Sequence, residues 1–216
     1  IEAIRFMHGD KLTYGRIYGQ EKNLATSAIA RMNLLLHGAK DFKVTQGDTL
    51  RSPNFLERGS LQTFDCVVAN PPFSLKNWGS EQFSSDIYGR NIWGCPTDSN
   101  GDFAWLQHMI HHLAPNGKIG LVLANGALST QSSGEGEIRK NIIQADLVEG
   151  IVALPTQLFY SVTIPVTPWF ISKNKKQKGK TLFIDARKMG YMVDRKHRDF
   201  SDEDIKKLAN TFTQCL

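Results

Sequence analysis

The sequence has 216 residues, of which 41% are hydrophobic and 22% charged, and this suits one large globular domain or a substantial part of one. It contains no run of about 18 apolar residues and does not open with a basic flank and an apolar stretch, so we expect neither a membrane span nor a secretory signal. The three cysteines are odd in number and far apart, which argues against a disulfide framework or a zinc site and for the reducing cytoplasm.

The net charge of +5 is concentrated near the C-terminus. From Lys173 to Arg198 the chain carries ten Lys or Arg and two Asp, a local charge of +8, so the remainder sums to −3. Five lysines lie close together in this region: Lys173, Lys175, Lys176, Lys178 and Lys180. Charge runs are usually solvated, which predicts an exposed turn. The alternative is contact with the phosphates of DNA.

Strands and helices are expected to alternate along the chain, a pattern typical of an α/β fold with a parallel sheet. Residues 1–8 resemble the end of a helix. A short strand over residues 16–20 ends at Glu21, and a helix is expected over about 23–37, where Gly38 is placed to stop it. Its apolar face is expected to consist of Leu24, Ala28, Met32 and Leu35. A second strand over residues 42–46 ends at Gly47-Asp48.

Glu21 and Asp48 therefore follow two consecutive predicted strands. In a nucleoside-binding α/β sheet, a carboxylate at a strand end can accept both ribose hydroxyls, and one on the next strand can accept from the adenine amino group. Either residue could equally begin a helix or form a turn.

The third strand, residues 64–69, is apolar and β-branched, and we expect it to be buried on both faces. It runs into Asn70-Pro71-Pro72-Phe73 at its carboxyl end, where ligands bind in open α/β sheets. The two prolines fix φ and remove two N–H donors, so the Asn70 amide and the Pro71 carbonyl are held as acceptors. An amino group on a planar ring would satisfy both, and Phe73 could stack on the ring. The simpler alternative is that Asn-Pro-Pro only terminates the strand.

Residues 74–101 lose periodicity but contain Trp78, Phe83, Tyr88 and Trp93. These aromatic residues either contact unpaired bases or anchor a long loop to the core. A helix follows over about 102–113, ended by Pro115-Asn116-Gly117. Its three histidines, His108, His111 and His112, lack an acidic or cysteine partner for a metal site, so we expect none.

The remaining elements complete the predicted sheet. Strands are expected over 118–124, 147–154, 163–172 and 181–186. A helix is expected over about 136–144, after a loop rich in Ser and Gly. A last helix begins at Ser201, which forms a capping-box arrangement with Asp204. The last two strands, joined by the lysine-rich turn, are predicted to form an antiparallel hairpin. We expect one partial catalytic domain over 1–216, with a sheet core to about 172 and the hairpin and C-terminal helix over about 173–216.

Taken together, these residues give the chain a specific resemblance. It resembles the modification (methyltransferase) subunit of type I restriction-modification systems, a family of adenine-N6 DNA methyltransferases. The matching stretches are Tyr18-Gly19-Gln20-Glu21-Lys22-Asn23, Ala30-Arg31-Met32-Asn33-Leu34, Asn70-Pro71-Pro72-Phe73, Gly136-Glu137-Ile138-Arg139 and Ile184-Asp185-Ala186-Arg187. The resemblance implies a Rossmann-like fold, here lacking the family's first strand and glycine-rich loop. We therefore expect a chain truncated at its start, which keeps the fold but loses its cofactor affinity and is inactive alone.

The resemblance also implies an activity: methyl transfer from S-adenosylmethionine to the N6 of an adenine flipped out of double-stranded DNA. Asn70, Pro71, Pro72 and Phe73 would be catalytic, and Glu21, Asp48 and Asn70 would contact the cofactor, with no metal. A specificity subunit and a restriction (nuclease) subunit would be the partners. The alternatives are an amino methyltransferase acting on protein glutamine or RNA guanine, and an inactive module that only assembles or binds DNA.

Overall fold

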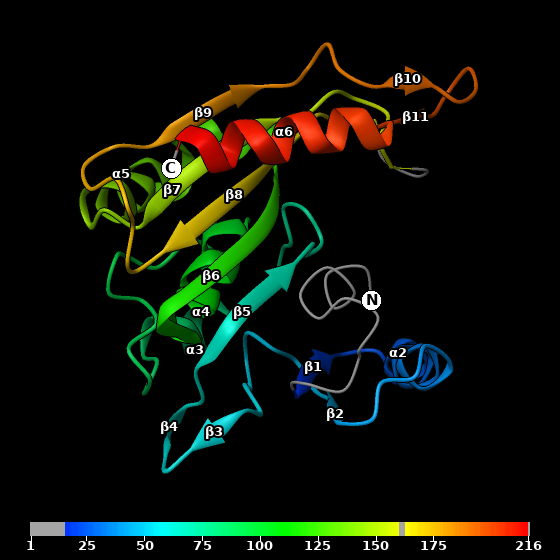
Figure 1. Ribbon diagram of the computed structural model, residues 1–216. Coiled ribbons are helices and arrows are strands. Elements are labelled where there is room, and N and C mark those ends of the chain that lie inside the picture. Colours follow the sequence, from blue (N-terminus) through cyan, green and yellow to red (C-terminus); the bar gives the residue numbers. More distant parts are fainter. Residues whose placement is uncertain (1–15, 160–162, 216) are drawn as a thin grey trace. The chain divides into compact units, whose positions relative to one another are not determined.

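The computed structural model describes residues 16–159 and 163–215 (Figure 1). The helix end predicted over residues 1–8 lies outside the described residues. The chain divides into two compact units, residues 1–61 and 62–216. None of the described helices is both long and apolar enough to cross a membrane.

The first unit contains two parallel strands joined by a helix, as the sequence predicts. Strand β1 (Ile17–Glu21) pairs with β2 (Phe42–Gln46), and α2 (Leu24–Leu36) connects them. The Asn23 side chain caps the helix by accepting from the backbone N–H of Thr26 at 3.1 Å. Gly38, with φ 78°, lets the chain turn after the helix. A short hairpin of β3 (Leu56–Glu57) and β4 (Ser60–Leu61) follows.

The apolar face predicted for α2 is not buried. Leu24, Met32 and Leu35 are 61%, 61% and 62% exposed, and Ser27 is the one buried residue of the helix. The face that is covered consists instead of Ser27, which is buried, and of Arg31 and Leu34, which are partly buried, and Arg31 Nη1 donates to the Val44 carbonyl of β2 at 3.3 Å.

The second unit is built around a five-stranded sheet in the order β5-β6-β8-β7-β9 (Figure 1). Its strands are β5 (Phe64–Ala69), β6 (Leu113–Ala124), β7 (Val148–Ala153), β8 (Val166–Ser172) and β9 (Leu182–Asp185). The pairings show that β8 runs against both of its neighbours, while the other strands share one direction. The sheet is therefore mixed, with one reversed strand in its interior.

The predicted antiparallel hairpin of residues 163–172 with 181–186 is wrong. Strand β8 pairs with β6 and β7, whereas β9 lies on the other side of β7 and runs parallel to it. The lysine-rich segment between them is a crossover, held by Lys175 and the Gly179 N–H on Asp146, just before β7. The hairpin that does occur near the C-terminus is shorter and joins β10 (Tyr191–Met192) to β11 (Arg198–Asp199).

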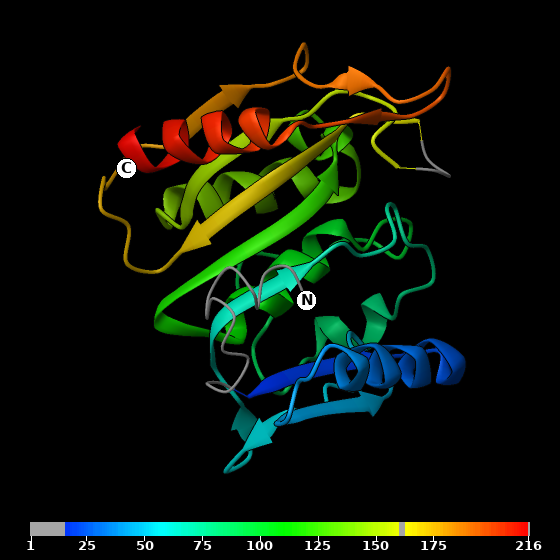
Figure 2. The same ribbon diagram turned by 45° about the vertical axis from the view of Figure 1, so that its right-hand side comes forward.

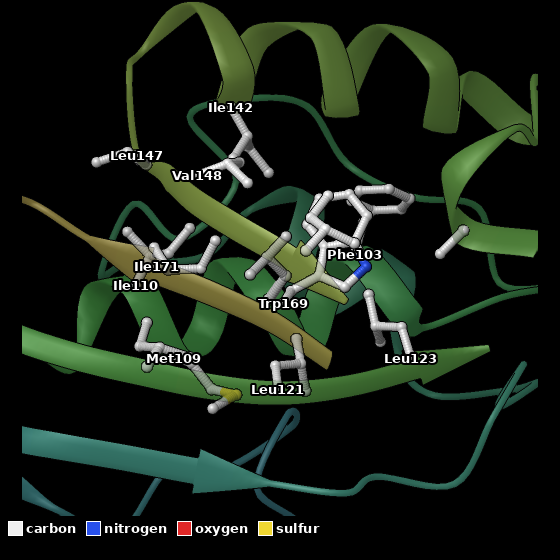
Figure 3. Packing of buried hydrophobic residues seen from close by; sticks show 14 of the residues in the cluster. Phe103, Met109, Ile110, Leu121, Leu123, Ile142, Leu147, Val148, Trp169 and Ile171 are labelled. Carbon is white, nitrogen blue, oxygen red and sulfur yellow. The ribbon is translucent and has the colours of Figure 1, made fainter. Parts of the chain in front are cut away.

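Helices cover both faces of this sheet. On one face, α4 (Asp102–His111) and α5 (Glu135–Gln144) supply Phe103, Ile110 and Ile142 to a core that includes Trp169 and Ile171 of β8 (Figure 3). On the other face lies α6 (Asp202–Cys215) (Figure 2). Its Phe212 packs against Phe170 of β8, with ring centroids 4.6 Å apart. Successive residues of a strand point to opposite faces, so β8 connects the two layers.

Two further expectations have different outcomes. The capping box of α6 is confirmed, because the Asp204 N–H donates to Ser201 Oγ at 3.1 Å and the Ser201 N–H to Asp204 Oδ2 at 3.3 Å. The expectation that residues 64–69 are buried on both faces is wrong. Strand β5 is at one end of the five-stranded sheet, and Val68 is 63% exposed.

Candidate functional site

The motif Asn70-Pro71-Pro72-Phe73 lies at the carboxyl edge of the five-stranded sheet. Strand β5 ends at Ala69, which pairs with Leu121 of the parallel strand β6. Strands β6, β7 and β9 run in the same direction, so their ends at Ala124, Ala153 and Asp185 face the same edge. Ligands of open α/β sheets bind at this edge.

Within the motif, one proline is anchored and the functional side chains are accessible. Pro71 is buried, Asn70 and Pro72 are exposed, and Phe73 is half-buried. The Phe73 ring meets Phe159 edge to face, with centroids 6.4 Å apart and planes at 72°. Phe159, between β7 and β8, was not identified from the sequence, because a single aromatic residue in an aperiodic segment carries no signal.

The backbone after Phe73 is tied to the start of α4. The Ser74 N–H donates to Asp102 Oδ1 at 2.9 Å, and the Gly101 N–H donates to the Leu75 carbonyl at 2.9 Å. Asp102 is only 2% exposed. Burial raises the pKa of its carboxyl, although the bond from Ser74 acts in the opposite direction.

The aromatic residues of the loop over 74–101 contact the protein itself. Trp78 and Phe83 are 2% and 1% exposed and meet edge to face at 5.3 Å, and the Trp78 Nε1–H donates to the Thr97 carbonyl at 2.9 Å. Trp93 meets His111 at 5.6 Å. These contacts support the anchoring interpretation. The loop also contains the short helix α3 (Ser80–Ser84).

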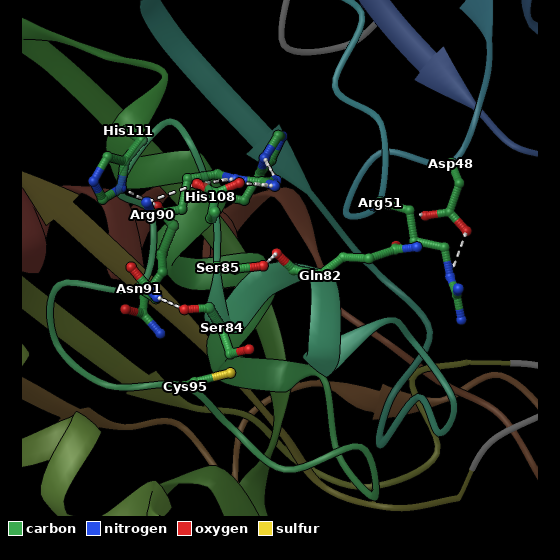
Figure 4. A network of polar contacts seen from close by, with 12 residues as sticks. Asp48, Arg51, Gln82, Ser84, Ser85, Arg90, Asn91, Cys95, His108 and His111 are labelled. Carbon is green, nitrogen blue, oxygen red and sulfur yellow. Dashed lines mark hydrogen bonds and ion pairs between the residues drawn. The ribbon is translucent and has the colours of Figure 1, made fainter.

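Arg90 takes part in a network of polar contacts in this loop (Figure 4). It is 2% exposed and donates through Nη2 to Asp86 Oδ1 at 2.6 Å and through Nε to Asp86 Oδ2 at 3.0 Å. Arg90 Nη1 lies 3.1 Å from His108 Nδ1, which must accept because a guanidinium has only donors. Burial, reinforced by His112 and Arg90, lowers the pKa of His108 well below its ordinary value. Among the described residues, no group of three or more His, Cys, Asp or Glu is arranged to hold a metal ion.

In the first unit, Glu21 and Asp48 lie at the ends of adjacent parallel strands. Glu21 Oε1 accepts from the Asn23 N–H at 2.7 Å, which starts the helix. Asp48 Oδ1 accepts from the Arg51 N–H at 3.2 Å, and Oδ2 pairs with Lys22 Nζ at 2.9 Å. Both carboxylates thus have the local roles of turn and helix-start residues. Both are partly accessible, and within the described part of the chain the second oxygen of Glu21 accepts no bond, so it can meet a ligand hydroxyl.

The five clustered lysines separate into two groups. Lys175 is 5% exposed and its Nζ lies 2.5 Å from Asp146 Oδ1, while Lys173 Nζ donates to the Leu113 carbonyl at 2.6 Å. These two hold the crossover to the sheet. Lys176, Lys178 and Lys180 are partly or fully exposed.

Comparison with known proteins agrees with this geometry. The profile of the family described as N-6 DNA Methylase matches residues 1–215. The chain belongs to the N-6 DNA methylase family. It is 47% identical over 214 residues to the type I restriction enzyme HindI methylase subunit of Haemophilus influenzae, covering 98% of this chain and 47% of that protein. It is 41% identical over 203 residues to the MjaIX methylase subunit of Methanocaldococcus jannaschii, covering 91% of this chain and 35% of that protein.

A solved structure of a family member is also similar. The crystal structure of a type I restriction-modification methyltransferase subunit from Streptococcus thermophilus matches with a TM-score of 0.85 and 27% identity, over 98% of this chain and 50% of that one. The chain therefore spans half or less of the length of these relatives.

Two of the stretches that resemble the family have structural contacts in the second unit. Arg139 Nη1 donates to the carbonyls of Ala127 and Thr130 at 3.2 and 2.8 Å and so holds the segment after β6. Arg187 pairs with Asp185 at 2.7 Å, and both line a cavity of about 390 Å³ at the carboxyl ends of β6, β7 and β9. The sequence alone predicts no role for either stretch.

Proposed function

We propose that this chain supplies the amine-holding and nucleoside-binding residues of a DNA methyltransferase that modifies the N6 of adenine. The observation that carries the proposal is the exposed Asn70 and half-buried Phe73 at the carboxyl edge of a parallel strand pair, in a chain whose family is the N-6 DNA methylases. The same family match favours adenine in DNA over a protein glutamine or an RNA guanine.

The motif would act by holding the target amine and its ring. The Asn70 amide oxygen and the Pro71 carbonyl would accept the two N6 hydrogens, which keeps the nitrogen lone pair directed at the incoming methyl group. Phe73 would stack on the purine. Because Phe73 and Phe159 now touch edge to face, the purine would enter beside them and Phe159 would form a second wall of its pocket. Methyl transfer would leave the nitrogen positively charged, and it would then release one N6 proton to solvent. The contribution of the motif would be positioning and electrostatics, with no metal required.

S-adenosylmethionine would supply an electrophilic methyl group on its sulfonium. Glu21 fits the nucleoside end of such a cofactor, because its second oxygen is available to ribose hydroxyls while Oε1 stays on the Asn23 N–H. Asp48 would accept from the adenine amino group of the cofactor, on the neighbouring strand end. We propose that residues 1–216 belong to one partial methyltransferase catalytic domain.

The partners would be those of a type I restriction-modification complex. A specificity subunit would choose the DNA sequence, and a nuclease subunit would cleave unmodified DNA. The relatives named above are methylase subunits of such enzymes, and one structural relative comes from work on complex assembly of the type I restriction-modification system. The cytoplasm, where DNA and the cofactor are present, would be the location.

The test is methyl transfer by the full-length protein together with its specificity subunit. Tritiated S-adenosylmethionine and unmethylated genomic DNA are the substrates, and the digested product is analysed for N6-methyladenine. Asn70→Ala and Phe73→Ala are expected to lower the rate by about a hundredfold or more, because each removes a group that acts on the reacting amine. Lys76→Ala, exposed on the same loop, is the control and should keep the wild-type rate. Near-normal transfer by Asn70→Ala would refute the mechanism, and label in cytosine or protein would refute the substrate.

A further inference from the structure

The conformation of the chain immediately after Phe73 is unusual for its residue type. Ser74 has φ 51°, in the left-handed region that residues other than glycine adopt only at a cost in free energy. Such a conformation persists only when the surroundings hold it. Here the surroundings are the Asp102 carboxylate, which accepts the Ser74 N–H at 2.9 Å, and the Gly101 N–H on the Leu75 carbonyl at 2.9 Å.

The residue that holds this loop is itself in an unfavourable environment. Asp102 is 2% exposed, and no cation forms an ion pair with it among the residues that the structure describes. A neutral acceptor could make the same bond without burying a charge. The favourable features are the N–H groups at the start of α4, the bond from Ser74 and a hydrogen bond with the Asn100 side chain.

A second buried carboxyl increases the cost. Glu135, the first residue of α5, is 1% exposed, and within the described residues its Oε1 has no hydrogen-bond partner. Burial raises the pKa of Glu135, and the negative charge of Asp102 acts in the same direction, whereas a hydrogen bond with Thr130 and the charge of Arg139 act against it. The Glu135 and Asp102 carboxyls, each near the start of a helix, therefore interact electrostatically.

We propose that Asp102 is a positioning residue, which acts through the Ser74 N–H to fix the loop that carries Asn70 and Phe73 at the catalytic edge. This inference rests on the proposed function, because it assigns a role to that same site. Asp102 would not touch the substrate. It would set the direction in which the chain leaves Phe73, and hence the placement of the ring against the target base and of Phe159 beside it.

Three single substitutions in the full-length protein separate the bond from the charge. Asp102→Ala removes the acceptor. Asp102→Asn keeps an oxygen for the Ser74 N–H and removes the charge. Glu135→Gln removes the neighbouring charge and leaves the Ser74 bond intact. Urea unfolding of each variant shows that the fold is retained under the assay conditions.

The kinetic readout is the split between kcat and KM for methyl transfer. We expect Asp102→Ala to lower kcat at least tenfold, since misplacing reacting groups by about 1 Å costs up to a hundredfold, while KM for S-adenosylmethionine stays within about twofold. Asp102→Asn should recover most of kcat, and Glu135→Gln should stay near the wild type. Wild-type kcat in Asp102→Ala would overturn the proposal, and so would an Asp102→Asn variant as impaired as Asp102→Ala.

Amide hydrogen exchange distinguishes this proposal from the proposed function. The Ser74 amide should exchange faster in Asp102→Ala than in the wild type or Asp102→Asn, in the absence of DNA and cofactor. If this pattern holds but the wild type transfers no methyl group to adenine, the proposed function fails while the loop contact stands. Unchanged exchange at Ser74 in Asp102→Ala would overturn the positioning role whatever the activity.

Discussion

Replacing Arg90 by alanine should be among the most destabilising single changes in the second unit. The guanidinium makes two hydrogen bonds to Asp86, one contact with His108 Nδ1 at 3.1 Å, and lies 5.0 Å from the centroid of the Phe83 ring. The side chains of Arg90 and Asp86 are 2% and 5% exposed. Arg90→Ala therefore removes both side-chain hydrogen bonds to a buried carboxylate and the donor to a buried ring nitrogen.

The size of the effect follows from this burial. Removing one partner of a buried ion pair costs about 3–5 kcal/mol. The Asp86 carboxylate keeps its backbone hydrogen bonds in the variant, from the N–H of residue 90 at 2.9 Å and from Tyr88, so we expect the lower end, about 3 kcal/mol. Arg90→Ala combined with Asp86→Ala should lose less than the sum of the single changes, by about 1–3 kcal/mol, since no buried charge remains.

The assay is urea unfolding of the 216-residue chain followed by tryptophan fluorescence. Lys140→Ala is the matched control, because Lys140 pairs with Glu137 at 3.1 Å but the two side chains are 56% and 72% exposed. That change should cost at most about 1 kcal/mol. If Arg90→Ala were no more destabilising than Lys140→Ala, the reasoning from burial would be refuted.

Three further changes have defined outcomes. Burial lowers the pKa values of His108, His111 and His112 below 6.5, so the unfolded chain binds protons at a higher pH than the folded chain does. The contribution of these histidines to stability is complete above about pH 6.5. Toward pH 5.5, the free energy of unfolding should fall by up to about 1.4 kcal/mol per pH unit for each histidine. His108→Gln should flatten that slope in urea titrations, whereas the raised pKa values of Asp102 and Glu135 contribute with the opposite sign. In the full-length protein, Glu21→Ala should weaken S-adenosylmethionine binding in calorimetry by about 1.5–3 kcal/mol for each hydrogen bond removed; unchanged affinity would leave Glu21 only its bond to the Asn23 N–H. Replacing Lys176, Lys178 and Lys180 by Gln should reduce the slope of log DNA affinity against log salt by about 0.9 for each phosphate that is no longer neutralised. As a control, Lys173→Gln with Lys175→Gln should lower stability and leave the slope unchanged. An unaltered slope in the variant of Lys176, Lys178 and Lys180 rules out phosphate binding by these three lysines.

Local features of the fold could be predicted from the sequence because they depend on neighbours in the chain. The helix after Asn23, the capping box at Ser201 and the strand over residues 42–46 follow from spacing and residue type alone. The pairing between strands cannot be predicted in this way, because the paired residues are far apart in the chain. Residues 166–172 and 182–185 look like a hairpin, but the observed pairings place β7 between the two strands, and Lys175 holds their connection to Asp146 just before β7.

The candidate site also has a part that could be predicted from the sequence and a part that could not. The position of Asn70 at the end of a strand could be predicted, since the apolar run before it is continuous in sequence. Asp102 reads as an ordinary helix-start residue, and its bond to the Ser74 N–H spans 28 residues, which no periodicity reveals. Phe159 was missed for the same reason. Asp102 and Phe159 both reach the motif through contacts that only the tertiary structure creates.

The reversed strand in the middle of the sheet has a consequence for how the chain is made. The ribosome releases β6 and β7 before β8, yet β8 separates them and pairs with both. Until Trp169 and Ile171 arrive, the facing edges of β6 and β7 have no partner, and unpaired strand edges promote aggregation. Non-local pairing of this kind is also slow. A nascent chain stalled before residue 166 should therefore depend on chaperones, whereas one released after residue 172 should close its central sheet without them.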